Sequence, residues 1–280
     1  MTTRALLLVG HGSSMGSGAA APVCAHADRI RTWHIFDEVH TAFWKQEPHV
    51  STALARIRSD EIDVVPLFLA DGFFTRDVLP GALGICDSIT RTGRQTIRYC
   101  PPVGVHPRMA DLTLRHAREA TTLPAEALGS AALVVVGHGT LRNAMSSSAV
   151  SRLCARIRAR SIFRDVVPAY LDEPPLVAPT VTRLDSGHII VVPFLLSEGW
   201  HTRQTIPDAL QLAGDRTERE GRVLWYARAV GTLPDVARIV VACTQKHRVG
   251  SAAATAARAM GCAAPGRRAP WAQPLGTLNG

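Results

Sequence analysis

The chain repeats itself after 127 residues, and this duplication limits its possible folds more than any other feature of the sequence. The segment "ALLLVGHGS" at 5–13 returns as "ALVVVGHGT" at 132–140, and "VVPLFLADGFFTRDVLPGAL" at 64–83 returns as "VVPFLLSEGWHTRQTIPDAL" at 191–210. Repeats in solenoid proteins are only about 20–50 residues long, so this period does not fit that architecture. It predicts two homologous domains instead.

The two predicted domains, 1–120 and 128–245, show the same alternation of strand and helix signals. Short runs such as "LLLV" and "VVPLF" are apolar on both faces, which is typical of central strands in a parallel sheet. Helical patterns lie between them, so we predict an α/β protein with two doubly wound, flavodoxin-like domains of four strands each. A linker near 121–130 joins them, and the Ala-, Gly-, Pro- and Arg-rich tail at 250–280 is expected to be disordered.

Composition and charge narrow the classes of function. The net charge is +8, and the Arg residues that dominate it are scattered rather than grouped in runs. This pattern favours a small polyanionic partner over nucleic acid. The six cysteines form no CxxC motif, which argues against zinc ribbons and cysteine-ligated clusters and predicts reduced thiols in a cytoplasmic protein. The first apolar run has only five residues, too few for a membrane span or a signal peptide core.

Polar side chains follow the predicted strands of the second domain, at the edge where open parallel sheets bind their ligands. His138 follows the first strand, Glu173 the second and His201 the third. Two imidazoles and a carboxylate suit a divalent ion such as Co²⁺, Fe²⁺, Ni²⁺ or Zn²⁺, and imidazoles also suit proton transfer near neutral pH. We therefore predict a metal-binding and catalytic site built from these three residues.

The first domain has His11, Glu47 and Phe74 at the positions we take as equivalent, using an alignment of 35–48 with 162–174 that contains one deletion. Phe74 cannot ligate a metal, so this set is one ligand short, and Phe74 is expected to form a wall of the substrate pocket. His11 is kept as a candidate catalytic residue. Structural roles stay open as well, because a His between glycines can bond to backbone and a Glu before Pro can begin a helix.

Further residues near these loops are candidates for substrate binding. Arg76 and Arg203 recur after the third strand and can hold substrate carboxylates, although both also suit a solvated surface. Trp200 can stack on a flat ring or anchor its own loop. Position 12 in the first "GHGS" motif is also expected to line the pocket; it is Gly12, and the serine of the motif is Ser13.

These motifs resemble those of the class II chelatases, in particular the sirohydrochlorin cobaltochelatase and ferrochelatase family of CbiX and SirB type. The resemblance rests on "LLLVGHGS", "AFWKQEP" and "VPFLLSEGWHT", and it covers both copies of the repeat but not the tail. Family members occur as single-domain dimers and as fused two-domain forms, and this chain looks like a fused form.

The resemblance implies insertion of a divalent metal, Co²⁺ or Fe²⁺, into sirohydrochlorin or a close tetrapyrrole relative, in cobalamin or sirohaem biosynthesis. It gives His138 and His201 the roles of metal ligand and base, with Glu173 at an acidic position used by some relatives. The metal is then a substrate, no tightly bound cofactor is expected, and neither nucleic acid nor membrane is a partner of this monomer or homodimer. Two alternatives remain open: a non-catalytic carrier of metal or tetrapyrrole, and another metal-dependent enzyme such as a hydrolase.

Overall fold

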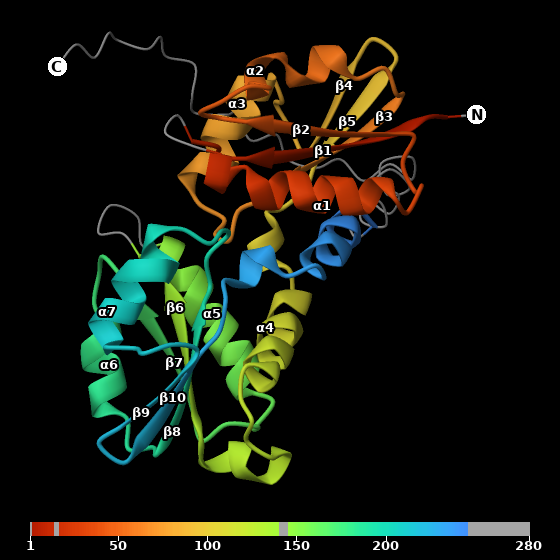
Figure 1. The fold of residues 1–280 in the computed structure, drawn as a ribbon. Helices are drawn as coiled ribbons and strands as arrows, with labels where there is room; N and C mark the ends of the chain where they lie inside the picture. Colours follow the sequence, from red (N-terminus) through yellow and green to blue (C-terminus); the bar gives the residue numbers. More distant parts are fainter. Residues whose placement is uncertain (1, 14–16, 140–144, 246–280) are drawn as a thin grey trace, which may run out of the picture.

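The computed structural model describes residues 2–13, 17–139 and 145–245, which form two α/β halves with one five-stranded sheet each (Figure 1). The tail at 250–280 that we expect to be disordered lies outside the described residues. The strand order is β2-β1-β3-β5-β4 in the first sheet and β7-β6-β8-β10-β9 in the second. Two largely parallel sheets with matching order confirm the predicted pair of doubly wound domains.

The first half places β1 and β3 inside its sheet, with β2 at one edge and the β4–β5 hairpin at the other. Its strands are β1 (Arg4–Gly10), β2 (Glu38–Phe43), β3 (Glu61–Pro66), β4 (Ile89–Thr92) and β5 (Gln95–Tyr99). Its α-helices are α1 (Ala21–Arg31), α2 (Val50–Ala53), α3 (Leu79–Leu83) and α4 (Arg108–Glu119). A π-helical turn (Phe74–Val78) leads directly into α3.

The second half has the same sequence of elements. Its strands are β6 (Ala132–Gly137), β7 (Asp165–Tyr170), β8 (His188–Pro193), β9 (Arg216–Arg219) and β10 (Arg222–Tyr226). Its α-helices are α5 (Met145–Arg158), α6 (Val177–Arg183), α7 (Ile206–Leu210) and a last helix over 236–245. A second π-helical turn (His201–Thr205) precedes α7, as the first precedes α3.

Each sheet contains one strand more than the four we predicted. The additional strands, β4 and β9, run antiparallel to β5 and β10. Left-handed residues form the turns of these hairpins, Gly93 in the first half and Glu220 with Gly221 in the second. Such turns are a hairpin signal. The strands themselves are largely exposed, so they lack the apolar runs by which the other strands are identified.

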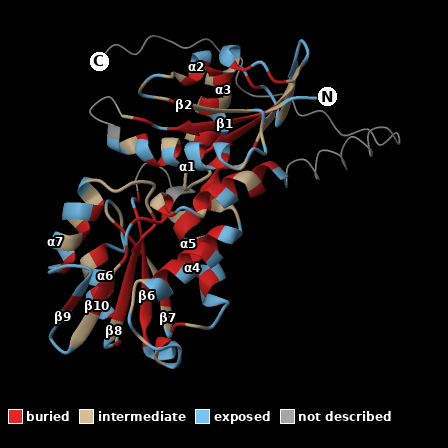
Figure 2. Cartoon of the chain, turned by 45° about the vertical axis from the view of Figure 1, so that its right-hand side comes forward, coloured by how far each residue is buried: buried red, intermediate tan, exposed pale blue. Residues whose placement is uncertain are grey.

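The inner strands are buried because helices cover both faces of each sheet. Every residue of β6 is buried, as are Ala5–Val9 of β1, and Figure 2 shows these strands enclosed by helices that are exposed only on their outer side. Such strands are firm supports for the loops at their carboxyl ends. Among the described residues, none of the helices combines the length and apolar character needed to cross a membrane.

The last helix of each half packs against the other half. α4 lies beside α5, and the His116 ring of α4 bonds to the Arg228 carbonyl at 2.9 Å (Figure 1). In the opposite direction, helix 236–245 lies along α1, where the Arg238 guanidinium stacks over the Trp33 ring at 5.6 Å. One hydrophobic cluster accordingly contains residues of both halves. The packed units therefore differ from the sequence repeats by an exchange of their last helices.

Candidate active site

The structure brings together the two histidines of the second half. His138 directly follows β6, and His201 begins the π-helical turn after β8. Their ring centroids are 4.9 Å apart, and the ring planes meet at 82°. Parallel strands end at the same edge of a sheet, which is why residues far apart in the sequence meet here.

The two glycines of the "GHG" motif make this position of His138 possible. Gly139 has a positive φ of 74°, a conformation that side chains rarely adopt. A Cβ on Gly139 would lie 2.8 Å from the Cβ of Tyr170 and 2.9 Å from the Cγ of Glu173. A Cβ on Gly137 would lie 2.6 Å from the Val150 side chain. The motif thus lets the backbone turn sharply against the loop that follows β7.

Hydrogen bonds around the π-helical turn hold His201 in place. The buried Thr202 hydroxyl bonds with the backbone of Gly199, and the Tyr226 hydroxyl donates to the Thr202 carbonyl at 2.8 Å. The His201 ring itself places Nδ1 3.2 Å from the Thr205 hydroxyl. Single π-turns occur frequently at functional sites, where they turn a side chain out of the regular helical register.

Both rings of the pair use Nδ1 for contacts with the protein. The Nδ1 of His138 is 3.1 Å from the Gly139 carbonyl and 3.1 Å from the carboxylate of Asp172. Within the described residues, neither Nε2 has a hydrogen-bond partner. Partial burial lowers the pKa of His201, and nearby His138 lowers it further, while Asp172 opposes the shift. His201 is therefore neutral at pH 7 and can accept a proton or a metal ion.

Glu173 lies over the glycine turn, and its position corrects one of our assignments. Its Oε1 would be 3.0 Å from a Cβ on Gly139, just as the Oε1 of Gln46 would be 3.1 Å from a Cβ on Gly12. The strand before each loop keeps the same offset, so no deletion separates the copies here. Glu173 is therefore equivalent to Gln46, and our pairing of Glu173 with Glu47 is wrong.

Glu47 has a local structural role instead. Its carboxylate accepts the backbone N–H of His49 at 2.9 Å, and its peptide bond to Pro48 is cis, as is the bond between Pro174 and Pro175 in the other half. Within the described ranges, no group of three or more His, Cys, Asp or Glu side chains is placed to hold a metal ion. The site is thus an open pair of histidines beside a carboxylate, rather than a three-ligand cage.

The equivalent loops of the first half form an aromatic cluster. His11 faces Phe74 with a centroid distance of 5.7 Å, and Phe74 in turn packs against Trp44 at 5.5 Å and Phe68 at 5.3 Å. His11 also keeps the backbone contact of its counterpart, with Nδ1 3.1 Å from the carbonyl of Gly12. The geometry of the loop is retained, but only one imidazole remains in it.

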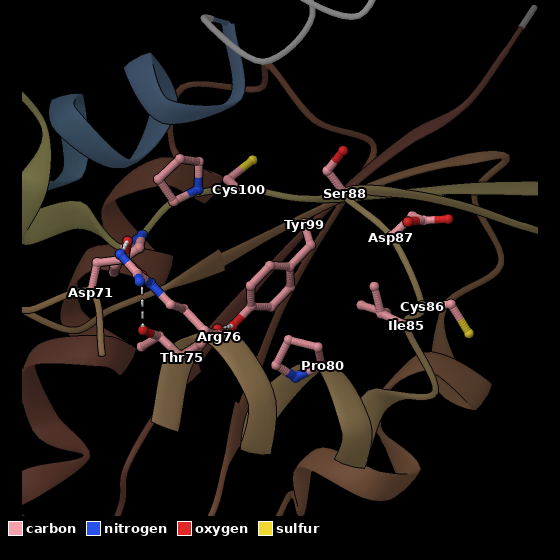
Figure 3. Close-up of a pocket in the computed structure, with 12 residues that line it drawn as sticks. Asp71, Thr75, Arg76, Pro80, Ile85, Cys86, Asp87, Ser88, Tyr99 and Cys100 are labelled. Carbon is pink, nitrogen blue, oxygen red and sulfur yellow. Dashed lines mark hydrogen bonds and ion pairs between the residues drawn. The ribbon is translucent and has the colours of Figure 1, made fainter. Parts of the chain in front are cut away.

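The two arginines that we predicted to bind substrate differ in their surroundings. Arg76 forms an ion pair with Asp71 at 2.8 Å and lines a pocket of 460 Å³ in the first half (Figure 3). Arg203 is exposed, and its side chain has no hydrogen bond or ion pair among the described residues. Glu198, which occupies the position of Asp71, accepts the backbone N–H of Ala229 at 2.6 Å instead. Arg203 is therefore the guanidinium available to a ligand.

The remaining predicted residues lie around the same loops. Trp200 is 74% exposed and Phe73, at the equivalent position of the first half, is 67% exposed, so neither anchors its loop in the core. Ser13 donates its backbone N–H to Gln46 at 3.0 Å. A cavity of 220 Å³ beside His138 is lined by residues of both halves, including Leu69 of the first. His138 therefore borders a cavity that residues of the other half help to form.

Comparison with known proteins places this architecture in one family. The CbiX family model matches the chain twice, at residues 5–120 and 132–246. The chain belongs to the CbiX family. A probable sirohydrochlorin cobaltochelatase of Halobacterium salinarum is 37% identical to this CbiX protein over 263 residues, which cover 85% of the chain and 89% of that relative.

Solved structures agree with the assignment to CbiX. DR2241 from Deinococcus radiodurans, a multi-domain protein with structural similarity to chelatases, has a TM-score of 0.75 at 28% identity. That match covers 87% of the present chain and only 55% of DR2241. SirB from Bacillus subtilis, determined with Fe³⁺, has a TM-score of 0.71 at 19% identity, covering 90% of this chain and 98% of SirB, and shares the fold.

Asp172 is the residue of this CbiX protein that our sequence analysis missed. The assumed deletion shifted Glu47 onto Glu173 and so hid the correspondence of Asp172 with Lys45. In the first half, the backbone N–H of Lys45 donates to the His11 carbonyl at 2.9 Å. The constant offset of 127 residues, applied without a gap, would have found it. An acidic residue two positions before a cis-proline loop is otherwise an ordinary surface residue in a sequence.

Proposed function

We propose that this CbiX protein inserts a divalent metal ion, Co²⁺ or Fe²⁺, into sirohydrochlorin or a close tetrapyrrole relative. The observation that carries the proposal is the pair His138 and His201, whose ring centroids are 4.9 Å apart. His138 also lines a cavity that residues of both halves enclose. Family membership and the cobaltochelatase name of the Halobacterium relative support the same chemistry.

The reaction makes two demands that this pair meets. A tetrapyrrole loses two pyrrole protons as the divalent ion enters, so a neutral base must stand close to the ring. The ion must also be delivered and released, which favours a few nitrogen and oxygen ligands over a closed cage. This open pair supplies both functions, because neither Nε2 has a hydrogen-bond partner among the described residues and burial lowers the pKa of His201. The ion is a substrate in this scheme, and no resident cofactor is needed.

The surroundings suit a flat, carboxylated ligand. Arg203 stands two residues from His201, and its side chain has no partner in the part of the chain that the structure describes. The whole chain carries a net charge of +8, which attracts an anionic substrate. Trp200 and Phe73 present exposed aromatic faces at equivalent positions of the two halves. Such faces stack on conjugated rings and add apolar contact area. We place the macrocycle between the halves, against the cavity beside His138.

A metallation assay tests the proposal. Purified protein is mixed with sirohydrochlorin and Co²⁺, Fe²⁺ or Ni²⁺ in parallel, and insertion is followed by the change in tetrapyrrole absorbance. The wild type should accelerate insertion over the uncatalysed rate, and His138→Ala and His201→Ala should each lose that acceleration. Unchanged insertion by His201→Ala would refute the assignment of the site. Stoichiometric binding of metal or tetrapyrrole without turnover would identify a carrier instead.

A further inference from the structure

We propose that Asp172 is a positioning residue for His138, whose carboxylate beside Nδ1 favours a proton on that nitrogen and leaves the lone pair on Nε2. The catalytic consequence rests on the proposed function, whereas the effect on the ring does not. The Oδ2 of Asp172 lies 3.1 Å from Nδ1 of His138, close enough to act on that nitrogen through its charge, while Nδ1 makes its hydrogen bond with the Gly139 carbonyl. Both side chains are about half exposed, so they meet at the mouth of the site.

The acceptors around the ring select one tautomer. A neutral imidazole carries a single N–H, and either nitrogen can hold it. The Nδ1 of His138 faces the carbonyl of Gly139 and the carboxylate of Asp172, and neither group can donate a hydrogen bond when the carboxylate is ionised. The proton therefore belongs on Nδ1. Nε2 is then unprotonated, which is the form that ligates a metal or takes a proton.

The consequence for metallation follows from this tautomer. When Nε2 accepts the proton of a pyrrole N–H, the pyrrole nitrogen keeps the electron pair with which it binds the incoming ion. The resulting imidazolium of His138 is stabilised by the adjacent carboxylate of Asp172 until it passes the proton to water. The carboxylate thus acts through the histidine and needs no contact with the tetrapyrrole.

The first half provides an internal control for this inference. His11 has the same backbone contact, 3.1 Å from Nδ1 to the Gly12 carbonyl, but Lys45 occupies the position of Asp172. The glycine carbonyl that contacts Nδ1 is therefore a feature of the loop in both halves. The carboxylate occurs only in the half that also has the second histidine, which separates its role from the folding of the loop.

Nitrogen-15 NMR of the metal-free protein tests the tautomer directly. Spectra are recorded near pH 8.5, above the ordinary histidine pKa of about 6.5, and the rings are assigned with His138→Gln and His11→Gln variants. We expect His138 to be Nδ1–H in the wild type and Asp172→Ala to raise its Nε2–H fraction to that of His11. The reciprocal change Lys45→Asp should move His11 toward the Nδ1–H form.

Kinetics supply the second readout. Asp172→Ala should lower kcat for metallation about tenfold, as for other carboxylates that orient a histidine, while KM for the tetrapyrrole stays within about twofold. Asp172→Asn keeps an acceptor oxygen, so its kcat should lie between those of the wild type and Asp172→Ala. Asp185→Ala, which removes a carboxylate that is 98% exposed, is the matched control and should behave as wild type.

Two results would overturn the role of Asp172. One is an Nε2–H tautomer at His138 in the wild type, and the other is a kcat for Asp172→Ala equal to that of Asp185→Ala in a protein that metallates tetrapyrroles. If the wild type does not metallate tetrapyrroles at all, the proposed function fails, and the NMR experiment still decides whether Asp172 sets the tautomer.

Discussion

At the end of the third parallel strand, the second half places His201 4.9 Å from His138, whereas the first half places Phe74 5.7 Å from His11. The loops that carry these rings are otherwise alike. Both start with a π-helical turn, and in each a tyrosine hydroxyl of the fourth parallel strand donates to the carbonyl of a buried threonine. The imidazole of His201 is therefore not required for this fold, since the first half keeps the same backbone with phenylalanine at that position.

The charged residues beside the histidines also differ between the two halves. Asp172 and Glu173 follow β7, whereas Lys45 and Gln46 follow β2 at the equivalent positions. The second half thus gathers groups that attract a cation, and the first half replaces them with a cation, an amide and the ring of Phe74. One complete pair is sufficient for one planar substrate, and the other copy is then free to serve as a wall.

The largest effect is expected where the second half is made like the first. His201→Phe copies the residue of the first half into the π-helical turn and removes one of the two imidazoles. Metallation should slow by at least about 100-fold, the usual range for losing a general acid or base. The same substitution should leave the far-ultraviolet circular dichroism unchanged, because the first half tolerates phenylalanine at this position.

The reverse change sharpens the same comparison. Phe74→His in the His201→Phe background restores two imidazoles to the first half, but Lys45 and Gln46 still stand where the second half has carboxylates. We expect less than about a tenth of the wild-type rate to return, because the carboxylate partner of the histidine is missing. Full recovery would show that the histidine pair alone is sufficient and that the neighbouring charges are irrelevant.

The sequence alone could predict the parts of this molecule that rest on local pattern. The duplicated "GHG" and "VVP" segments predicted the two sheets, because buried parallel strands are continuous apolar runs. The end of each strand then located His138 and His201, since parallel strands end at one edge. Both inferences need only the order of residues along the chain.

Other features depend on which copy an element packs against, and a repeat carries no information about that. α4 and helix 236–245 occupy equivalent positions of the repeat, and nothing in the sequence pattern states that each packs against the opposite half. β4 was missed because none of its residues is buried, so it lacks an apolar run. Asp172 was missed because an unneeded gap hid its equivalence to Lys45, and only the contact with His138 gives it a role.

The next largest effect is expected at the amino ends of the strands, where the first half has a buried ion cluster. Asp63 is fully buried between Arg4, at 3.6 Å, and Arg98, at 3.9 Å. The second half has Ile190 at the position of Asp63 and Trp225 at that of Arg98. Asp63→Ala removes the carboxylate beside Arg4 and leaves the largely buried Arg98 with Glu61 alone, so it should cost about 3 kcal/mol of stability.

Urea unfolding measures this cost. The variant Glu61→Ala removes the more exposed carboxylate of the same cluster, 2.8 Å from Arg98, and should cost less. Metallation below the unfolding transition should be unchanged in both variants, because the cluster lies at the opposite end of the strands from the histidines. A buried polar group that loses its partner usually costs about 1–3 kcal/mol. A loss of less than about 1 kcal/mol for Asp63→Ala would therefore mean that water replaces the carboxylate, contrary to our assignment.

A smaller effect is expected at the two equivalent arginines. Arg203→Ala removes a guanidinium that has no protein partner among the described residues, and it should raise KM for the tetrapyrrole about fivefold, as expected for one partly exposed charge-assisted hydrogen bond. Arg76→Ala should change KM much less, because Asp71 already holds that guanidinium at 2.8 Å. Equal effects of the two variants would place Arg76 in the substrate site as well.

The smallest effect concerns two histidines that join the halves, and it is a dependence of stability on pH. His26 of α1 bonds to the Gly231 carbonyl at 2.8 Å, and His116 of α4 bonds to the Arg228 carbonyl at 2.9 Å. Burial lowers the pKa of both rings below the ordinary value of about 6.5. Below that pH the unfolded chain therefore binds more protons than the folded one, and stability falls as the pH drops toward the folded-state pKa values.

Urea midpoints measured between pH 8 and pH 5 test this linkage. The wild type should lose stability below about pH 6.5, and the double variant His26→Gln with His116→Gln should lose less, because glutamine can still donate to the carbonyls but does not titrate. His34→Asn, at an exposed position with positive φ, is the control and should keep the wild-type profile. An unaltered loss in the double variant would show that these two contacts do not titrate, and that the exchanged helices hold the halves together through apolar packing alone.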